Sequence, residues 1–192
     1  MGLYERDLRG LLDDIADPSP APGAGAVSAV VTAMAAGLIA SAARRSPDWA
    51  QARGVSAQAQ SLRARVEKQA EANEEAYLAA LALIGDATEA GSRNEAFRKA
   101  LDAAAEMPLA IAECAYDVSL LGVEAATNAA PGGAEDASAA AMLAEAAARA
   151  AASLVAANLI SVPGDERVVQ AQNLAAAATD AARRAVAATA RG

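Results

Sequence analysis

The sequence predicts an all-α protein, a helical bundle that forms a single domain over residues 1–192. Hydrophobic residues make up 55% of the chain but aromatic residues only 3%, and alanine dominates. Alanine is the strongest helix former, so close helix packing is favoured over a sheet. Two alanine-rich helices, at about 26–45 and 134–161, should form the centre of the bundle. Small alanine faces also let helices of two subunits approach closely, so we expect a homodimer.

The N-terminal segment, about 3–16, should form an amphipathic helix. Its apolar residues fall on one face, which we expect to pack across the bundle. These residues are Leu8, Leu11, Leu12 and Ile15. A turn rich in proline and glycine, Pro18 to Gly25, then leads into the first alanine-rich helix. Its prolines fix φ and remove amide donors, and its glycines let the chain turn sharply.

Two long helices should follow in the middle of the chain. Ser46 and Pro47 predict a helix start, and Gly85 an end. The inward-facing candidates of this helix are Val66, Tyr77, Leu78, Leu81 and Ile84. A capping box from Ser92 to Glu95 predicts the start of the next helix, which Pro108 should interrupt.

Glycine and proline also divide the C-terminal part. A segment from Leu109 to Asn128 should end before Pro131, and the second alanine-rich helix should run from about Ala134 to Ser161. A Pro-Gly pair at 163–164 then breaks the chain. Asp165 should cap a final helix that runs toward the C-terminus.

Composition excludes several classes of function. The net charge of −8 and the lack of a basic stripe argue against nonspecific nucleic-acid binding. The chain has no histidine, which excludes Ser-His-Asp and Cys-His catalysis and histidine metal sites. Cys114 is the single cysteine, which excludes an internal disulfide and fits a small buried residue in a reducing cytoplasm. We expect no metal and no cofactor.

An uncharged stretch between Asp17 and Arg44 is long enough to span a membrane. Prolines and glycines fill its first third, and the rest is mostly alanine with a few polar residues, so a buried central helix explains it better. The N-terminus carries charged residues where a signal peptide would have an apolar core. We therefore expect a cytoplasmic protein that does not enter the membrane.

The turn formed by Pro22, Gly23, Ala24 and Gly25 is the first candidate binding site. Free amides at the start of the following helix should attract a carboxylate, a phosphate or an electron-rich ring atom, with no bulky side chain in the way. The alternative is a tight turn between two helices without a ligand.

Asp136 is the candidate catalytic residue. It lies at the start of an otherwise apolar helix, where it either caps the helix or faces a site in which it could take a proton from water or orient an amine. Asn158 falls near the same helix face but about 33 Å further along, so one chain cannot aim both at one carbon. Asn158 should instead satisfy a neighbouring backbone group, or serve the site of another subunit.

Four features in one order resemble the cyclodeaminase/cyclohydrolase family, which includes the C-terminal domain of formiminotransferase-cyclodeaminase. They are the 11–25 entry with its Pro-Gly-Ala-Gly turn, the segment Glu74–Tyr77, the segment Ala104–Leu109, and the series Asn128, Asp136 and Asn158-Leu159. The resemblance covers nearly the whole chain, and the joint order carries it.

The resemblance implies a dimeric helical bundle that binds a tetrahydrofolate derivative as substrate near the turn and Asp136. Asn128 belongs to the matching series. Two reactions are implied: hydrolysis of methenyltetrahydrofolate to the formyl form, or cyclisation of formiminotetrahydrofolate with loss of ammonia. The absence of a fused formiminotransferase domain favours the cyclohydrolase. A relative acting on a non-folate imine or amidine and a noncatalytic helical scaffold are the alternatives.

The sequence also departs from the family pattern. Ala24 and Ala26 replace a glycine and a serine of the turn, and Ser28 should point elsewhere on the helix. Arg44 and Arg45 lie near the position of the family's lysine and could hold a glutamyl carboxylate, or form a solvated charge pair. Asn73 replaces an acid. The candidates for a second acid or base are Tyr77, Lys99, Tyr116 and Glu135.

Overall fold

The computed structural model describes residues 3–18, 22–86, 90–160 and 162–190, without the side chains of 73–77, 79–81 and 83–97. Within these ranges the chain is all α, as predicted, and contains no strand. A short 3₁₀ helix, η1 (Leu3–Glu5), precedes six α-helices. They are α1 (Leu8–Ala16), α2 (Ala24–Arg44), α3 (Ala52–Asp86), α4 (Ala90–Asn128), α5 (Gly133–Asn158) and α6 (Glu166–Thr189).

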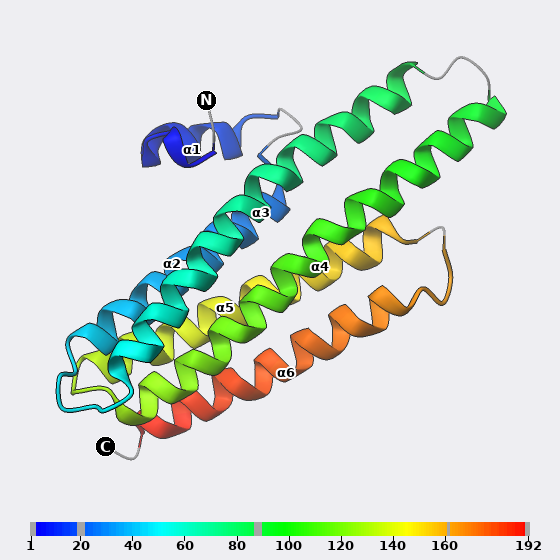
Figure 1. Cartoon of the computed structure of the whole chain (residues 1–192). Coiled ribbons are helices and arrows are strands. Elements are labelled where there is room, and N and C mark those ends of the chain that lie inside the picture. The colour runs from blue at the N-terminus through cyan, green and yellow to red at the C-terminus, as the bar shows by residue number, and fades with distance from the viewer. Residues whose placement is uncertain (1–2, 19–21, 87–89, 161, 191–192) are drawn as a thin grey trace.

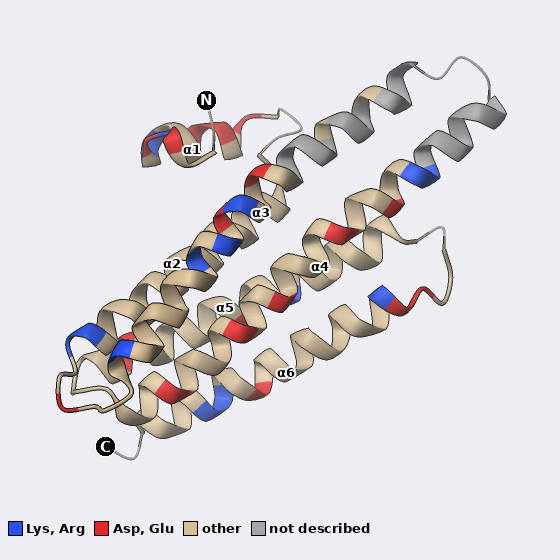
Figure 2. Cartoon of the chain, in the orientation of Figure 1, with Lys and Arg blue, Asp and Glu red and all other residues tan. Residues whose placement is uncertain are grey.

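Five of these helices, α2 to α6, lie side by side in an elongated bundle (Figure 1). α4 packs against α3, α5 and α6, and α2 packs against α3 and α5. Contact between α2 and α5 confirms the predicted alanine-rich pair, whose buried faces consist mostly of alanine. Charged residues lie at intervals along α3 to α6, whereas α2 is uncharged up to its last residue, Arg44 (Figure 2).

Both alanine-rich helices are long and apolar enough to cross a bilayer. In the bundle, 61% of the apolar window of α2 and 44% of that of α5 lie buried inside the protein. Core helices of a bundle show this combination of apolar composition and internal packing.

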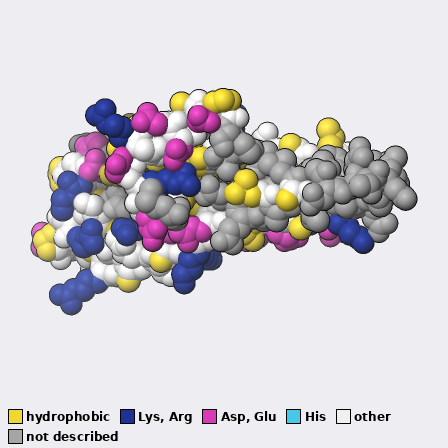
Figure 3. Space-filling model, turned by 90° about the horizontal axis from the view of Figure 1, so that it is seen from above, with side chains coloured by type: hydrophobic (Ala, Val, Ile, Leu, Met, Phe, Trp, Pro, Cys, Tyr) yellow, Lys and Arg dark blue, Asp and Glu magenta, His cyan; other side chains and the backbone are white. Residues whose placement is uncertain are grey.

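The N-terminal segment differs from the prediction. Instead of one helix there is a break at Arg6, after which Asp7 caps α1 by accepting a hydrogen bond of 2.7 Å from the Gly10 amide. α1 buries none of its residues. Leu8 is 62% exposed and Leu12 58% exposed, so most of this face does not pack across the bundle as expected. Leu11 is partly buried and packs against the core. Figure 3 views the molecule from above relative to Figure 1. On this face, apolar side chains lie among acidic and basic ones.

Ser46 does not start a helix as predicted. Its hydroxyl donates to the Ala42 carbonyl at 2.8 Å and accepts from the Ala130 amide at 2.8 Å, so it joins the end of α2 to the α4–α5 connection. α3 begins only at Ala52.

Several other expectations can be compared with the described residues. Val66 and Cys114 are buried as predicted, and Asp165 caps α6 by accepting from the Arg167 amide. Leu78 is 44% exposed, in contrast to its predicted inward position. α4 begins at Ala90, so the predicted capping box lies inside the helix. The side chains of Tyr77, Leu81 and Ile84 and of residues 92–95 lie outside the described set.

Pro108 does not interrupt its helix, contrary to the prediction, because α4 is continuous from residue 90 to residue 128. Proline lacks the amide that would bond to the carbonyl four residues earlier, that of Ala104. The side-chain amide of Asn158 donates to this carbonyl at 2.9 Å. This contact confirms the structural interpretation of Asn158, which supplies the donor that Pro108 removes.

Replacing Asn158 with alanine is therefore expected to destabilise the protein by about 1–3 kcal/mol, because the Ala104 carbonyl loses its donor. Urea unfolding of the wild type and the variant measures the loss. In a Pro108→Ala background the helix supplies its own amide, so the same substitution should cost less. Asn128→Ala is the matched control, since the Asn128 side chain donates to a Glu124 carbonyl within its own exposed helix end. Equal losses at Asn158 in both backgrounds would contradict this role.

Candidate functional site

Asp136 lies in the first turn of α5, where its carboxylate forms an ion pair with the guanidinium of Arg45 at the end of α2. The neighbouring Glu135 caps the helix instead, because its carboxylate accepts a hydrogen bond of 2.6 Å from the Gly132 amide. The side chain of Asp136 is 43% exposed and that of Arg45 is 55% exposed. Asp136 is therefore accessible to a ligand, and its carboxylate does not cap the helix.

The backbone holds these two residues close together. A Cβ atom added at Gly133 would meet Ala42 at 3.5 Å, which shows that α5 begins tightly against the last turns of α2. The positive N-terminal end of α5 suits the Asp136 carboxylate, and the negative C-terminal end of α2 suits the Arg45 guanidinium. The local fields of both helices thus support the pair.

Two other predicted site residues lie at the same end of the bundle. Arg44 is exposed in the last turn of α2, and Asn128 is the last residue of α4. The side-chain amide of Asn128 donates to the carbonyl of Glu124 at 2.8 Å. Basic residues gather where α2 ends (Figure 2).

The predicted binding turn lies at the opposite end of α2. Gly23 is the N-cap residue without a side-chain cap, and the first intrahelical bond runs from the Val27 amide to the Gly23 carbonyl. The amides of residues 24–26 therefore have no partner within the helix, as the sequence predicts. Pro22 and Gly25 are buried, whereas Gly23 and Ala24 are exposed. The length of α2 separates this turn from Arg45 and Asp136 by about 30 Å within one chain.

The candidates for a second acid or base are mostly distant from Asp136. Glu135 is adjacent but occupied as the cap. Tyr116 and Lys99 lie on α4, about 18 Å and 44 Å along the helix from its C-terminal end. The side chain of Tyr77 lies outside the described residues. Among the described side chains, no group of three acidic or cysteine residues is placed to hold a metal ion.

Sequence reasoning missed a groove of 640 Å³ between α4 and α6. Its lining includes Tyr116, Gln170 and Asn173, and the Gln170 amide donates to the Glu113 carboxylate at 2.9 Å. Its lining combines Tyr116 of α4 with residues of α6 and the turn before it, which are distant in the sequence, so no local motif could have revealed it.

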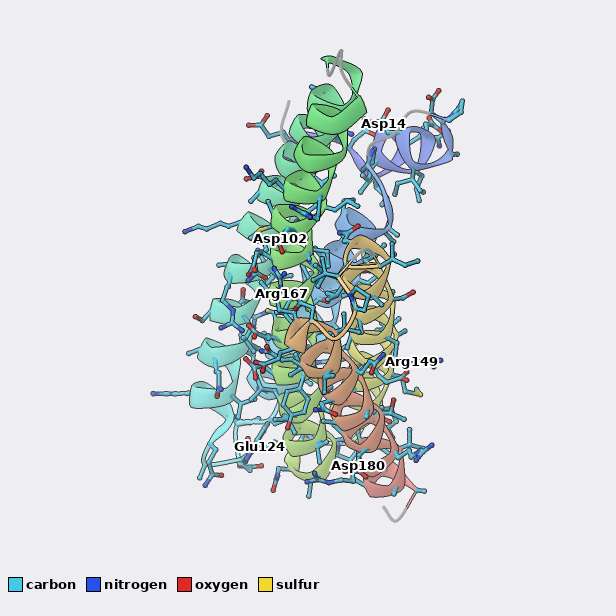
Figure 4. The ribbon with its side chains drawn as sticks, turned by 90° about the vertical axis from the view of Figure 1, so that its right-hand side faces the viewer. Asp14, Asp102, Glu124, Arg149, Arg167 and Asp180 are labelled. Atoms are coloured by element: carbon cyan, nitrogen blue, oxygen red, sulfur yellow. The ribbon has the colours of Figure 1, made fainter. Side chains whose placement is uncertain are left out.

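Near this groove, one guanidinium binds three carboxylates. Arg167 pairs with Asp165 at 2.7 Å, with Glu106 at 2.7 Å and with Asp102. Figure 4 shows Arg167 beside Asp102, joining the start of α6 to α4. Hydrogen bonds from Arg167 lower the pKa of Asp165 to about 2. The same carboxylates raise the pKa of Arg167.

The lowered pKa of Asp165 predicts how stability depends on pH. The ionised carboxylate binds Arg167 only in the folded state, so its contribution is full above its ordinary pKa of 3.8 and is lost as the pH falls toward about 2. Arg167→Gln should therefore destabilise the protein at neutral pH, and the difference from wild type should shrink over this window. Urea unfolding across that pH range measures it, with Arg149→Gln as the control at an exposed pair within α5. A difference independent of pH would contradict the assignment.

Comparison with known proteins identifies the family. The model of the formiminotransferase-cyclodeaminase family matches residues 7–179, which include both the turn and Asp136. The chain belongs to the formiminotransferase-cyclodeaminase family. The match confirms the resemblance carried by the sequence motifs. No curated protein sequence matches the chain.

A solved structure shares the fold of this formiminotransferase-cyclodeaminase family member. It is the crystal structure of formiminotetrahydrofolate cyclodeaminase from Thermotoga maritima, with a TM-score of 0.83 and 21% sequence identity. The similarity covers 95% of each chain. The two proteins therefore share one fold over nearly their whole length, although about four of every five aligned residues differ.

Proposed function

We propose that this protein is a folate one-carbon enzyme that cyclises formiminotetrahydrofolate to methenyltetrahydrofolate and releases ammonia. The family match over residues 7–179 carries the proposal. The full-length similarity to a structure named as a formiminotetrahydrofolate cyclodeaminase supports the cyclodeaminase over the cyclohydrolase favoured by the sequence alone.

The chemistry needs one group that moves a proton between two nitrogens. The N10 amine of the folate attacks the amidinium carbon and forms the new C–N bond, and N10 gives up its proton. The bond to the terminal nitrogen then breaks, and this nitrogen takes up a proton and leaves as ammonia. In our proposal Asp136 accepts the first proton and donates the second. Its carboxylate also stabilises the cationic ring that forms.

The neighbouring residues would orient the substrate. Arg45 holds the Asp136 carboxylate in the free protein. With Arg44, it provides a basic end of the bundle for the glutamyl carboxylate of a folate, and a guanidinium binds such a group with two hydrogen bonds. Asn128 lies on the same end. The turn Pro22–Gly25 lies at the other end of α2, about 30 Å away within one chain, so it does not contact the same reacting carbon in that chain.

Methenyltetrahydrofolate cyclohydrolase is the second candidate. The exposure of the Asp136–Arg45 pair favours it, because water reaches the carboxylate and could be activated to attack the same carbon. The two reactions share methenyltetrahydrofolate, which is the product of one and the substrate of the other.

One assay distinguishes these activities. Purified protein is incubated with formiminotetrahydrofolate, and both the absorbance of methenyltetrahydrofolate and free ammonia are followed against buffer. Equal gains in both signals establish the cyclodeaminase. Loss of added methenyltetrahydrofolate faster than in buffer establishes the cyclohydrolase. If neither folate turns over, the proposed folate activity is contradicted. The remaining hypotheses are then an enzyme that acts on a non-folate imine or amidine, or a noncatalytic scaffold.

A further inference from the structure

The groove between α4 and α6 has the size of a small-molecule site. Its volume of 640 Å³ lies within the range of about 300–1,000 Å³ that ligand sites occupy. One wall is a single stripe of α6, because the lining residues from Glu166 to Ala177 recur every three or four positions. Tyr116 of α4 forms the other wall. The groove therefore lies along the line where two helices meet.

Most of the groove surface is apolar. The apolar side chains that α6 contributes are Val169, Leu174 and Ala177. The half-buried ring of Tyr116 packs against a small core cluster that includes Ala147 and Ala178, which holds it beside the groove. An occupant thus needs a flat apolar body that can lie against this ring.

The polar groups at the groove are mostly unpaired acceptors. Among the described residues, neither the Asn173 side chain nor the Tyr116 hydroxyl forms a hydrogen bond. The Gln170 amide donates to Glu113, which leaves the Gln170 side-chain oxygen as an acceptor. The Glu166 carboxylate is also an acceptor. An occupant should therefore carry N–H donors.

The charge around the groove is negative. Glu166 lines it and Glu113 lies beside it, and among the described side chains neither carboxylate forms an ion pair. In the same part of the chain no lysine or arginine lines the groove. The nearby Arg167 is already bound by three carboxylates, so that cluster is also negative. Figure 2 shows that acidic residues recur along α4. A cation would be stabilised by these carboxylates and by the face of the tyrosine ring.

We propose that this groove binds an organic cation with a flat apolar body and N–H donors, of which an aromatic amidinium is the simplest example. Its body lies against Tyr116 and the apolar side chains, and its N–H groups donate to the Glu166 carboxylate and the neighbouring Gln170 oxygen. The site is separate from Asp136, because Tyr116 lies about 18 Å along α4 from the end of the bundle that holds Asp136. It does not rest on the proposed folate activity.

Binding is tested with benzamidine, which is a cation at neutral pH, and with benzamide, a neutral molecule of nearly the same shape. Ligand-detected NMR titrations of the whole protein give both dissociation constants. Benzamidine should bind about tenfold more tightly than benzamide, from the charge pairs and the aromatic face together. This advantage should shrink between about 0.01 M and about 1 M salt, over which the Debye length falls from about 30 Å to about 3 Å.

Four variants locate the binding in the groove. Glu166→Gln keeps the size of the side chain but removes its charge, and should weaken benzamidine binding about 2–5-fold without changing that of benzamide. Tyr116→Leu removes the aromatic face and should weaken benzamidine binding by a similar factor, whereas Tyr116→Phe keeps the face and should bind like the wild type. Asp48→Asn is the matched control, because it changes the net charge equally at an exposed position between α2 and α3. Urea unfolding verifies that each variant is folded.

Two results would overturn the proposal. The first is benzamidine that binds no more tightly than benzamide, or that loses no affinity in Glu166→Gln and Tyr116→Leu proteins. The second concerns formiminotetrahydrofolate, which itself carries an amidinium and is tested as a competitor on Asp136→Asn protein. If this folate displaces benzamidine, the groove belongs to the folate site and is not a separate one. Benzamidine binding is measured without turnover, so its failure is distinguishable from a failure of the proposed activity.

Discussion

Asp136→Asn is expected to lower kcat by about 10²–10⁴-fold, the range that a positioned acid–base group contributes. The amide keeps the size and shape of the side chain but can neither accept the proton from N10 nor stabilise a cation. Because Arg45 and the backbone of the α5 start remain, KM for the folate should change much less than kcat. Initial rates of methenyltetrahydrofolate formation or loss at several substrate concentrations give both constants.

Glu135→Gln is the matched control for this variant. Glu135 is the adjacent acid, but its carboxylate accepts from the Gly132 amide and caps α5. Glutamine can make the same bond, so kcat should stay near that of the wild type. If the two variants lose the same activity, or if Asp136→Asn loses none, Asp136 is not the proton carrier.

Gly122→Val is expected to have the largest effect on stability. Gly122 lies where α4 and α5 are closest, and a Cβ atom built there would be 2.8 Å from the Ala141 Cβ and 3.2 Å from the Ala137 carbonyl oxygen. Neither atom belongs to a flexible side chain that could move away, so the two helices must separate. We expect a loss of about 3 kcal/mol in the free energy of unfolding, measured by urea denaturation.

Gly54→Ala provides the opposite control. Gly54 lies in α3, where a Cβ atom would meet nothing within 4 Å. Alanine should stabilise the protein there by about 0.5–1 kcal/mol, because glycine loses more conformational entropy in a helix. A similar change in the two variants would show that the contact between α4 and α5 is not as tight as the structure indicates.

The helices could be predicted where the cause is local. Glycine and proline mark the breaks at Gly23, Gly132 and Gly164, and Asp165 caps the final helix as predicted. The break predicted at Pro108 is wrong because the donor that replaces the missing proline amide comes from Asn158, 50 residues away in the sequence. No local pattern contains that contact.

Packing and the site depend on contacts between distant segments. The spacing of Leu8, Leu12 and Ile15 predicts an apolar face but does not say what covers it, and in the structure as described these three side chains remain exposed. The sequence identified Asp136 but not its ion pair with Arg45, which joins residues 91 positions apart. It also could not tell which of two adjacent acids caps α5.

The hydroxyl of Ser46 bears on how easily a ligand could enter. By bonding to α2 on one side and to the α4–α5 connection on the other, it fixes the backbone beneath Arg45 and Asp136 independently of their side chains. An exposed ion pair of this kind contributes about 1 kcal/mol or less. An incoming anion could therefore exchange places with the Asp136 carboxylate on Arg45 at little energetic cost, and the helices would stay where they are. The two Ser46 hydrogen bonds thus keep the backbone at this end of the bundle in place whichever group the Arg45 side chain binds.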